Sequence, residues 1–392
     1  MNLFYQSNVP ANQNLLYKTT EDAKNATVGE LDIRLDEANG FIYNHAFDPD
    51  KVNYSGEYDN NQNWSPYFAA YIDRQIDYLV SKYIPEDSVI VEVGCGKGYY
   101  VEKLVRKLSN CTAYGFDTSY VYEEGEPLLN NLQYFKEYYD GKYAYLRPDV
   151  VICRHVIEHI HNPLEFLKEI RATMPEHALL FIETPDVNWI LKNTAIFDFF
   201  YEHCSYWNEK SIEYVLRLSG FEIIESKCEF GGQYMWIVSR AVSSAPMPAV
   251  HDNHLSYMKN LCCKFANDRV CEINSVMHSL YLLKQKGTAV FVWGAGAKGT
   301  TFVNLFDEHK QFVSALIDIS PAKQNKFVGK TSHKVLESIF LINMLISNNT
   351  EGGVILVLNE NYVSEVNSLL IELDLKCVAY SYPEFKSIEK IL

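Results

Sequence analysis

The side chains best suited to acid–base chemistry lie in one short stretch, Asp198–Tyr206, which reads Asp-Phe-Phe-Tyr-Glu-His-Cys-Ser-Tyr. An imidazole has an unperturbed pKa of about 6.5, so His203 is suited to remove a proton near neutral pH. Glu202 can raise that basicity or orient another group, and Tyr201 can donate a hydrogen bond to a developing oxyanion. We predict that His203 is a general base. The alternative is a buried histidine with purely structural hydrogen bonds.

A second group of ionisable residues follows the apolar segment 149–153. It contains Arg154, His155, Glu158 and His159. The last three are spaced as on one face of a helix, and structural hydrogen bonding and catalysis by His155 both stay open. Two histidines four residues apart can share a metal ion, but the sequence shows no third ligand nearby. We therefore predict no metal.

The segment 89–98, Val-Ile-Val-Glu-Val-Gly-Cys-Gly-Lys-Gly, predicts a buried strand and a glycine turn into a helix. Gly94 permits the tight turn, Gly96 lets a ligand approach the backbone, and Gly98 lets the helix pack on the strand. The turn alone is weak evidence, because dinucleotide-binding folds use nearly the same one. The acid before it, Glu92, would repel a pyrophosphate but could hold an amino group.

Two further residues extend this predicted ligand site. Asp117 ends the next predicted strand, where a carboxylate can accept hydrogen bonds from a ribose diol. Arg154 ends the fourth predicted strand at the same sheet edge. An amino group and a ribose together suit S-adenosyl-L-methionine (SAM), which we predict as the cofactor. The alternative is that Glu92 and Asp117 only cap helices or turns.

A second glycine turn lies at residues 294–299, Gly-Ala-Gly-Ala-Lys-Gly. It has no acid at the strand end, and Lys298 and the helix N-terminus both favour an anion. A phosphate role, a vestigial nucleotide fold and a true NAD site are all open. The predicted substrate-binding residues are Gly294, Gly296, Lys298, Gly299, Thr300, Asp318 and Lys323.

Alternating apolar strands and helical segments predict parallel sheets covered on both sides. Before Gly220 we expect strands at 89–93, 112–117, 132–136, 149–153 and 178–183, and helices at 65–83, 98–108, 163–174 and 209–219. Strands at 221–228 and 233–241, a long helix from His254 to Gln285 and strands at 289–293, 314–317, 354–358 and 377–380 follow.

This order predicts three parts in an α/β chain. Residues 1–70 are rich in aromatic rings and form a loop-rich cap with short strands near 31–35 and 40–43. Residues 71–245 form a methyltransferase-type Rossmann-like domain, closed by a hairpin at Gly231-Gly232. Residues 250–392 form a second, smaller Rossmann-like domain.

Composition narrows the classes of partner. The chain has 392 residues, 47% hydrophobic, and a net charge of −15, which argues against a nucleic-acid surface. The N-terminus has neither the basic nor the apolar region of a signal peptide, and no stretch reaches the roughly 20 apolar residues of a membrane span. Nine cysteines without a Cys-x-x-Cys pair suit a reduced cytoplasmic protein. We expect a monomer or small homo-oligomer.

Several motifs in this order resemble the sugar C-methyltransferases that act on nucleotide-linked keto-sugars. They are 9–14 (VPANQN), 41–49 (FIYNHAFDP), 58–66 (YDNNQNWSP), 92–98 (EVGCGKG), 153–159 (CRHVIEH), 201–206 (YEHCSY), 293–301 (WGAGAKGTT) and 321–324 (PAKQ). Together these motifs are specific, whereas each alone is not.

The resemblance implies methylation of a ring carbon next to the ketone of a keto-deoxysugar, through an enolate. It implies that His203 is the base, with Tyr201 and Glu202 beside it, that Tyr58 reaches the substrate, and that the C-terminal domain, residues 250–392, holds the nucleotide part of the substrate. We expect Tyr201 or His155 to stabilise the enolate oxygen. An O-methyltransferase acting on a sugar or sugar nucleotide is the alternative. An oxidoreductase using the second glycine turn and a non-enzymatic scaffold are weaker rivals.

The chain departs from this family in one respect. Such enzymes usually carry four N-terminal cysteines that bind zinc, but this sequence has no cysteine before Cys95. We therefore predict no zinc here, and we expect aromatic packing to take the place of the metal in holding the cap together.

Overall fold

The computed structural model describes residues 1–54, 61–108, 110–121, 129–244, 252–338 and 353–390. Its largest sheet has seven strands in the order β11-β12-β9-β8-β5-β6-β7, and only β12 runs antiparallel to its neighbours. The strands are β5 (Val89–Val93), β6 (Thr112–Phe116), β7 (Leu132–Phe135), β8 (Val150–Arg154), β9 (Leu179–Pro185), β11 (Phe221–Glu229) and β12 (Tyr234–Ala241). The predicted strands, the hairpin and the α/β fold class are confirmed.

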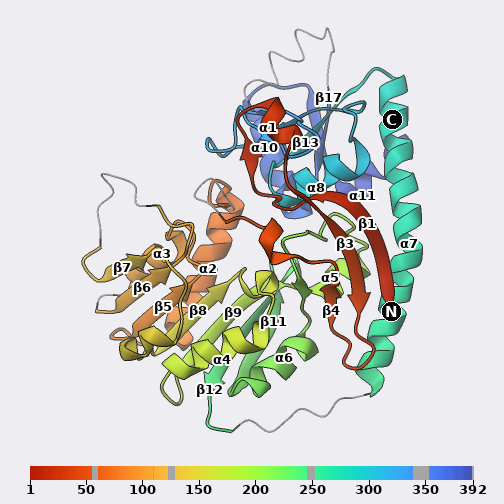
Figure 1. Cartoon of the computed structure of the whole chain (residues 1–392). Helices are drawn as coiled ribbons and strands as arrows, with labels where there is room; N and C mark the ends of the chain where they lie inside the picture. The colour runs from red at the N-terminus through yellow and green to blue at the C-terminus, as the bar shows by residue number, and fades with distance from the viewer. Residues whose placement is uncertain (55–60, 109, 122–128, 245–251, 339–352, 391–392) are drawn as a thin grey trace.

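Helices cover both faces of this sheet (Figure 1). One face packs against α2 (Pro66–Lys82) and α3 (Tyr99–Lys107), and the other against α4 (Pro163–Thr173) and α6 (Glu209–Leu218). Because both faces are covered, strands such as β5 are almost wholly apolar. The carboxyl ends of the parallel strands are left free to form a site.

The N-terminal part contains more strand than the sequence predicts. Its sheet has the order β1-β3-β4-β10 and consists of β1 (Asn2–Pro10), β3 (Val28–Leu35), β4 (Ile42–Asn44) and β10 (Ser205–Tyr206). Polar residues in β1, such as Asn2, Gln6 and Asn8, hide its strand character from pattern reading. Because β10 directly follows the predicted base, this sheet positions the stretch that carries His203.

Aromatic rings tie this sheet to the rest of the chain. The rings of Phe4 and Phe199 lie 5.1 Å apart, and those of Phe199 and Phe265 lie 5.3 Å apart. Phe265 belongs to α7 (Asp252–Gln285), the long helix that runs beside β1 along one edge of the molecule (Figure 1). The expected aromatic packing is therefore present.

The C-terminal part contains a second sheet, entirely parallel, in the order β16-β14-β13-β17-β18. Its strands are β13 (Ala289–Trp293), β14 (Val313–Ile317), β16 (Val335–Leu336), β17 (Gly353–Val357) and β18 (Cys377–Ser381), and its helices are α8 (Ala297–Phe306), α10 (Val363–Glu372) and α11 (Tyr382–Phe385). The other short strands and α-helices of the described residues are β2 (Leu16–Tyr17), which pairs with β15 (Phe327–Val328), α1 (Thr20–Lys24) and α5 (Val187–Lys192). Among the described residues, no helix combines the length and apolar character needed to cross a membrane.

A glycine fixes the contact between strand and helix in this second fold. A Cβ atom on Gly299 would overlap the carbonyl oxygen of Gly294, which is backbone and has no room to move. We expect Gly299→Ala to lower the free energy of unfolding by about 1–3 kcal/mol, because the clash outweighs the better helix propensity of alanine. Thermal unfolding measures this change. The matched control is Gly141→Ala, where no atom lies within 4 Å of an added Cβ, and equal melting temperatures for the two variants would contradict the argument.

Candidate active site

The carboxyl ends of the parallel strands of both sheets open onto one cavity. Its wall includes His155, Glu158, His159, Glu202 and His203 from the larger sheet and its loops. From the C-terminal part come Gly294, Gly296, Lys298, Gly299, Asp318 and Lys323. Most of the predicted catalytic and substrate-binding residues, far apart in sequence, thus line the same space.

His203 is buried in this cavity, with 8% of its surface exposed. Its ring stands perpendicular to that of His159, with the ring centres 4.7 Å apart. Burial and the neighbouring His159 lower the pKa of His203 to about 3, whereas Glu158 opposes the shift. The imidazole is therefore neutral at pH 7 and can accept a proton, but so low a pKa also makes it a weak base, so its protonated form needs a negative partner.

Glu158 lies at the centre of the histidine cluster. One carboxylate oxygen accepts a hydrogen bond from Thr184 Oγ1 at 3.0 Å, and the other lies 3.5 Å from His155 Nδ1. Burial disfavours the charged form, but His155, His159 and His203 outweigh it and lower the pKa of Glu158 to about 2. The carboxylate is therefore ionised although it is almost fully buried.

The prediction that His155, Glu158 and His159 lie on one face of a helix is wrong. β8 ends at Arg154, and only a single 3-10 turn, Ile157–His159, follows. His155 itself has a φ of 52°, a conformation that side chains other than glycine rarely adopt, and its N–H donates to the Glu183 carbonyl. With this backbone turn, both His155 and His159 line the cavity. Sequence spacing alone does not predict this arrangement.

The structure also changes the premise of the metal prediction. Glu158, His159 and His203 each offer one ligand atom, and these atoms lie within 4.8 Å of one another. His155, which the sequence paired with His159, is not part of this group, and His203, which the sequence did not link to it, takes that place. The absence of a metal stays a prediction.

Tyr201 does not face the cavity. Its side chain is fully buried, its ring packs on Gly29, and its hydroxyl accepts a hydrogen bond from the Asp48 N–H at 2.9 Å. The hydroxyl is therefore bonded to the backbone, and the predicted role as an oxyanion donor is corrected to a structural one. Tyr58 lies outside the described residues.

Glu202 lines the cavity and is bonded to the backbone of the N-terminal part. Its carboxylate accepts hydrogen bonds from the backbone N–H groups of Gln13 and Asn14. The second predicted role, orienting another group, fits these contacts, because Glu202 fixes the loop that follows β1. Asn14 in turn lies on the cavity wall.

Sequence reading missed Tyr54. Its hydroxyl lies 2.8 Å from His159 Nδ1, and the two rings meet edge to face. Burial raises the pKa of Tyr54, so its phenol stays protonated. The tyrosine-rich stretch before α2 predicted an aromatic cap. No spacing in the sequence predicted that Tyr54 contacts a histidine 105 residues away.

The predicted SAM-binding residues gather at the carboxyl end of β5. Glu92 is buried and accepts a hydrogen bond from the Val101 N–H in α3 at 3.0 Å, so it does cap the helix as the alternative held. Burial nevertheless raises the pKa of Glu92 to about 8. A nearby ammonium group would offset that cost, so the site fits the amino group of SAM.

The glycine turn at residues 94–98 packs closely against a neighbouring side chain. Gly98 has a φ of 87°, and an added Cβ would overlap the Tyr134 hydroxyl. Asp117 accepts hydrogen bonds from the Gly96 N–H and from Ser119, and it remains partly exposed. Asp117 therefore both braces the glycine turn and keeps the position expected for a ribose contact.

Arg154 is held by the sheet rather than lying on the cavity wall. Its Nε donates to Glu183 at 2.6 Å, and its guanidinium lies 4.2 Å over the ring of Tyr100. Its Nη2 is buried without a hydrogen-bond partner among the described residues. A buried, unpaired donor near Glu92 also fits the carboxylate of the amino-acid end of SAM.

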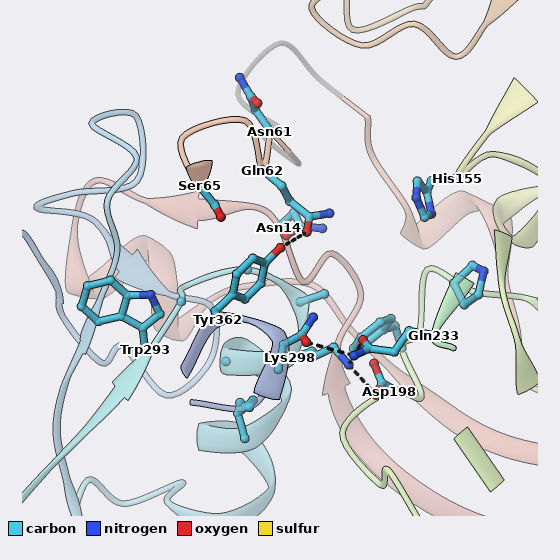
Figure 2. Close-up of a pocket in the computed structure, with 18 of the residues that line it drawn as sticks. Asn14, Asn61, Gln62, Ser65, His155, Asp198, Gln233, Trp293, Lys298 and Tyr362 are labelled. Carbon is cyan, nitrogen blue, oxygen red and sulfur yellow. Dashed lines mark hydrogen bonds and ion pairs between the residues drawn. The ribbon is translucent and has the colours of Figure 1, made fainter. Parts of the chain in front are cut away.

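The second glycine turn differs from its prediction in two residues. Lys298 forms an ion pair with Asp198 at 2.6 Å and a longer bond with Gln233 (Figure 2). Thr300 is fully buried in α8 and does not line the cavity, which corrects its assignment. Asp318 accepts the Ala295 N–H, and Lys323 lies 4.0 Å from Asp318.

Comparison with known proteins adds two findings. Residues 64–226 match a family model described as a methyltransferase domain. The chain carries a SAM-dependent methyltransferase domain. Residues 258–366 match the C-methyltransferase C-terminal domain. The predicted fold class, methyltransferase character and cofactor are thus confirmed, while the site residues stay predictions.

Individual relatives are distant. The tRNA U34 carboxymethyltransferase of Campylobacter jejuni strain 81116 is 28% identical over 102 residues, which are 24% of this chain and 34% of that protein. The chain thus spans about a third of the length of the curated relatives it matches. Human N-acetylserotonin methyltransferase in complex with SAM has a TM-score of 0.35 and 12% identity, covering 44% of this chain and 55% of that one. An Aquifex aeolicus SAM-dependent methyltransferase has a TM-score of 0.32 and 15% identity, covering 44% and 98%.

The ion pair between Lys298 and Asp198 gives a test of the cavity wall. We expect Lys298→Met to lower the free energy of unfolding by about 2 kcal/mol, because it leaves the largely buried Asp198 carboxylate without its partner. The double variant Lys298→Met/Asp198→Asn should recover most of this loss in urea denaturation. Equal losses in the single and double variants would show that the pairing contributes nothing.

Proposed function

We propose that this methyltransferase acts on a carbon next to the ketone of a nucleotide-linked keto-deoxysugar. The observation that carries the proposal is the placement of buried, neutral His203 in a cavity shared with the second glycine turn. A base beside a phosphate-type turn suits an acceptor with an acidic C–H bond at one end and a nucleotide at the other. The description of the C-terminal family model as that of a C-methyltransferase supports transfer to carbon.

The chemistry divides between the residues of the cavity. SAM, when bound, supplies an electrophilic methyl group. His203 removes the proton from the carbon next to the ketone, because a C–H bond is a poor nucleophile until it is ionised. His155, with its ring on the cavity wall, stabilises the enolate oxygen in place of Tyr201. Holding both reactants at one sheet edge supplies further acceleration.

The C-terminal part holds the nucleotide in this proposal. The N-terminus of α8, Lys298 and Lys323 attract an anion, and Asp318 ends β14 in the position for a ribose contact. Lys298 must then share its charge between Asp198 and the substrate. The net charge of −15 supports a small-molecule acceptor over a nucleic acid, although one group of relatives is named for tRNA.

Replacing the proposed base gives the first test. We expect His203→Asn to reduce turnover about 100- to 10,000-fold, because a general base contributes about that much. SAM affinity, measured separately by calorimetry, should stay unchanged. The control is His278→Asn, which alters an exposed histidine on α7. Near-normal turnover in a folded His203→Asn protein would remove His203 as the base.

Solvent exchange distinguishes the two candidate reactions. With a 4-keto sugar nucleotide in heavy water, we expect the enzyme to place deuterium on the carbon next to the ketone, because the enolate is reprotonated by solvent. Mass spectrometry detects the added mass. Methyl transfer without any such exchange, with the methyl group on oxygen, would favour the O-methyltransferase alternative.

A further inference from the structure

The buried position of His203 creates an electrostatic requirement. A neutral imidazole that takes a proton becomes a cation, and burying an unpaired cation is strongly unfavourable. The walls around His203 must therefore hold a negative charge that is close, ionised and not already neutralised by a lysine or arginine. The candidates on the cavity wall are Glu158, Asp198, Glu202, Asp318 and Glu365.

The other four carboxylates are held by partners outside the histidine cluster. Asp198 pairs with Lys298, Asp318 lies 4.0 Å from Lys323, Glu202 accepts backbone N–H groups of Gln13 and Asn14, and Glu365 accepts bonds from Ser65 and Tyr67. Glu158 differs because its ionisable neighbours are the imidazoles themselves. Its carboxylate lies within 4.8 Å of ligand atoms of both His159 and His203.

The structure also holds Glu158 in place. Thr184 Oγ1 donates to one of its oxygens, and His155 Nδ1 lies beside the other. The backbone carbonyl of Glu158 is near the side chains of Cys204 and Ser205, which follow His203 in the chain. The carboxylate and the proposed base are therefore fixed relative to each other by three separate elements: β8, β9 and β10.

We propose that Glu158 is a positioning residue that orients His203 and stabilises the imidazolium formed when His203 takes the substrate proton. This inference rests on the proposed function. The C–H bond breaks, its proton passes to the imidazole, and the electron pair remains on the substrate as the enolate. Glu158 stays ionised throughout, so the pair has no net charge after the transfer. This is the division of labour known from carboxylate–histidine pairs in other enzymes.

Deuterium exchange in the absence of methyl transfer measures proton removal from the substrate by itself. The full-length protein, saturated with S-adenosylhomocysteine, is incubated in heavy water with thymidine-, cytidine- and guanosine-diphosphate 4-keto-6-deoxyhexoses. The initial rate of deuterium incorporation is measured for each probe that the unmodified protein exchanges. The variants are Glu158→Gln, which keeps the shape without the charge, and Glu158→Asp, which keeps the charge.

We expect Glu158→Gln to slow exchange at saturating probe at least about 100-fold, while the half-saturating probe concentration changes less than about 3-fold. Glu158→Asp should recover part of the rate, because the negative charge returns. The matched control is Glu225→Gln, which removes a carboxylate bonded to Tyr78, Lys82 and Tyr83 outside the cavity. This control should exchange at the unmodified rate.

The outcomes separate the two proposals. Unchanged exchange in folded Glu158→Gln overturns the role of Glu158 and leaves the proposed function intact, whereas no exchange in the unmodified protein overturns both. Exchange that is lost on dialysis against a chelator and restored by zinc also overturns the positioning role, because Glu158 would then act as a metal ligand. If Glu158→Gln does not fold, Thr184→Val, which removes the bond holding the carboxylate, must slow exchange at saturation or the inference fails.

Discussion

The arrangement of this molecule depends on one constraint: the carboxyl ends of the parallel strands in two separate sheets must face the same cavity. Several hydrogen bonds across the junction maintain it. Glu365 of α10 accepts bonds from Ser65 and Tyr67 at the start of α2, and Gln233 donates to Asn359 at 2.9 Å. Figure 2 shows Tyr362 bonded to Gln62 on the same wall. Because each sheet alone offers half a site, these contacts determine whether a base and an anion-binding turn can meet.

The two halves bring different chemistry to that cavity. The larger sheet contributes imidazoles and a buried carboxylate, a set suited to moving a proton. The smaller sheet contributes lysines and a helix N-terminus, a set suited to holding an anion. In both halves an aspartate at a strand end, Asp117 or Asp318, accepts an N–H from its own glycine turn. The same carboxylate thus rigidifies the turn and stays near the ligand position, so structural and binding roles are not alternatives.

Burial explains why the charged groups of the site are paired as they are. An isolated charge in a low-dielectric cavity is unfavourable, so Lys298 pairs with Asp198 and Arg154 pairs with Glu183. The Glu158 carboxylate accepts a hydrogen bond from Thr184 and lies beside His155. Sequence reading did not predict the pairing of Lys298 with Asp198, because it considered one turn in isolation. It also assigned Tyr201 a role beside the base, but the Tyr201 hydroxyl is bonded to the Asp48 backbone.

The sequence by itself determined the strands and helices of both α/β folds, since buried parallel strands are continuous apolar runs and glycine turns mark their ends. It also identified His203, His155 and Glu202 as cavity residues, because reactive side chains after strand ends share one sheet edge. Only the tertiary structure decided which groups meet. β10 pairs with β4 and carries His203 to Glu158, and Tyr54 reaches His159. Such contacts join residues far apart in the chain, and they depend on packing between elements, which local periodicity does not encode.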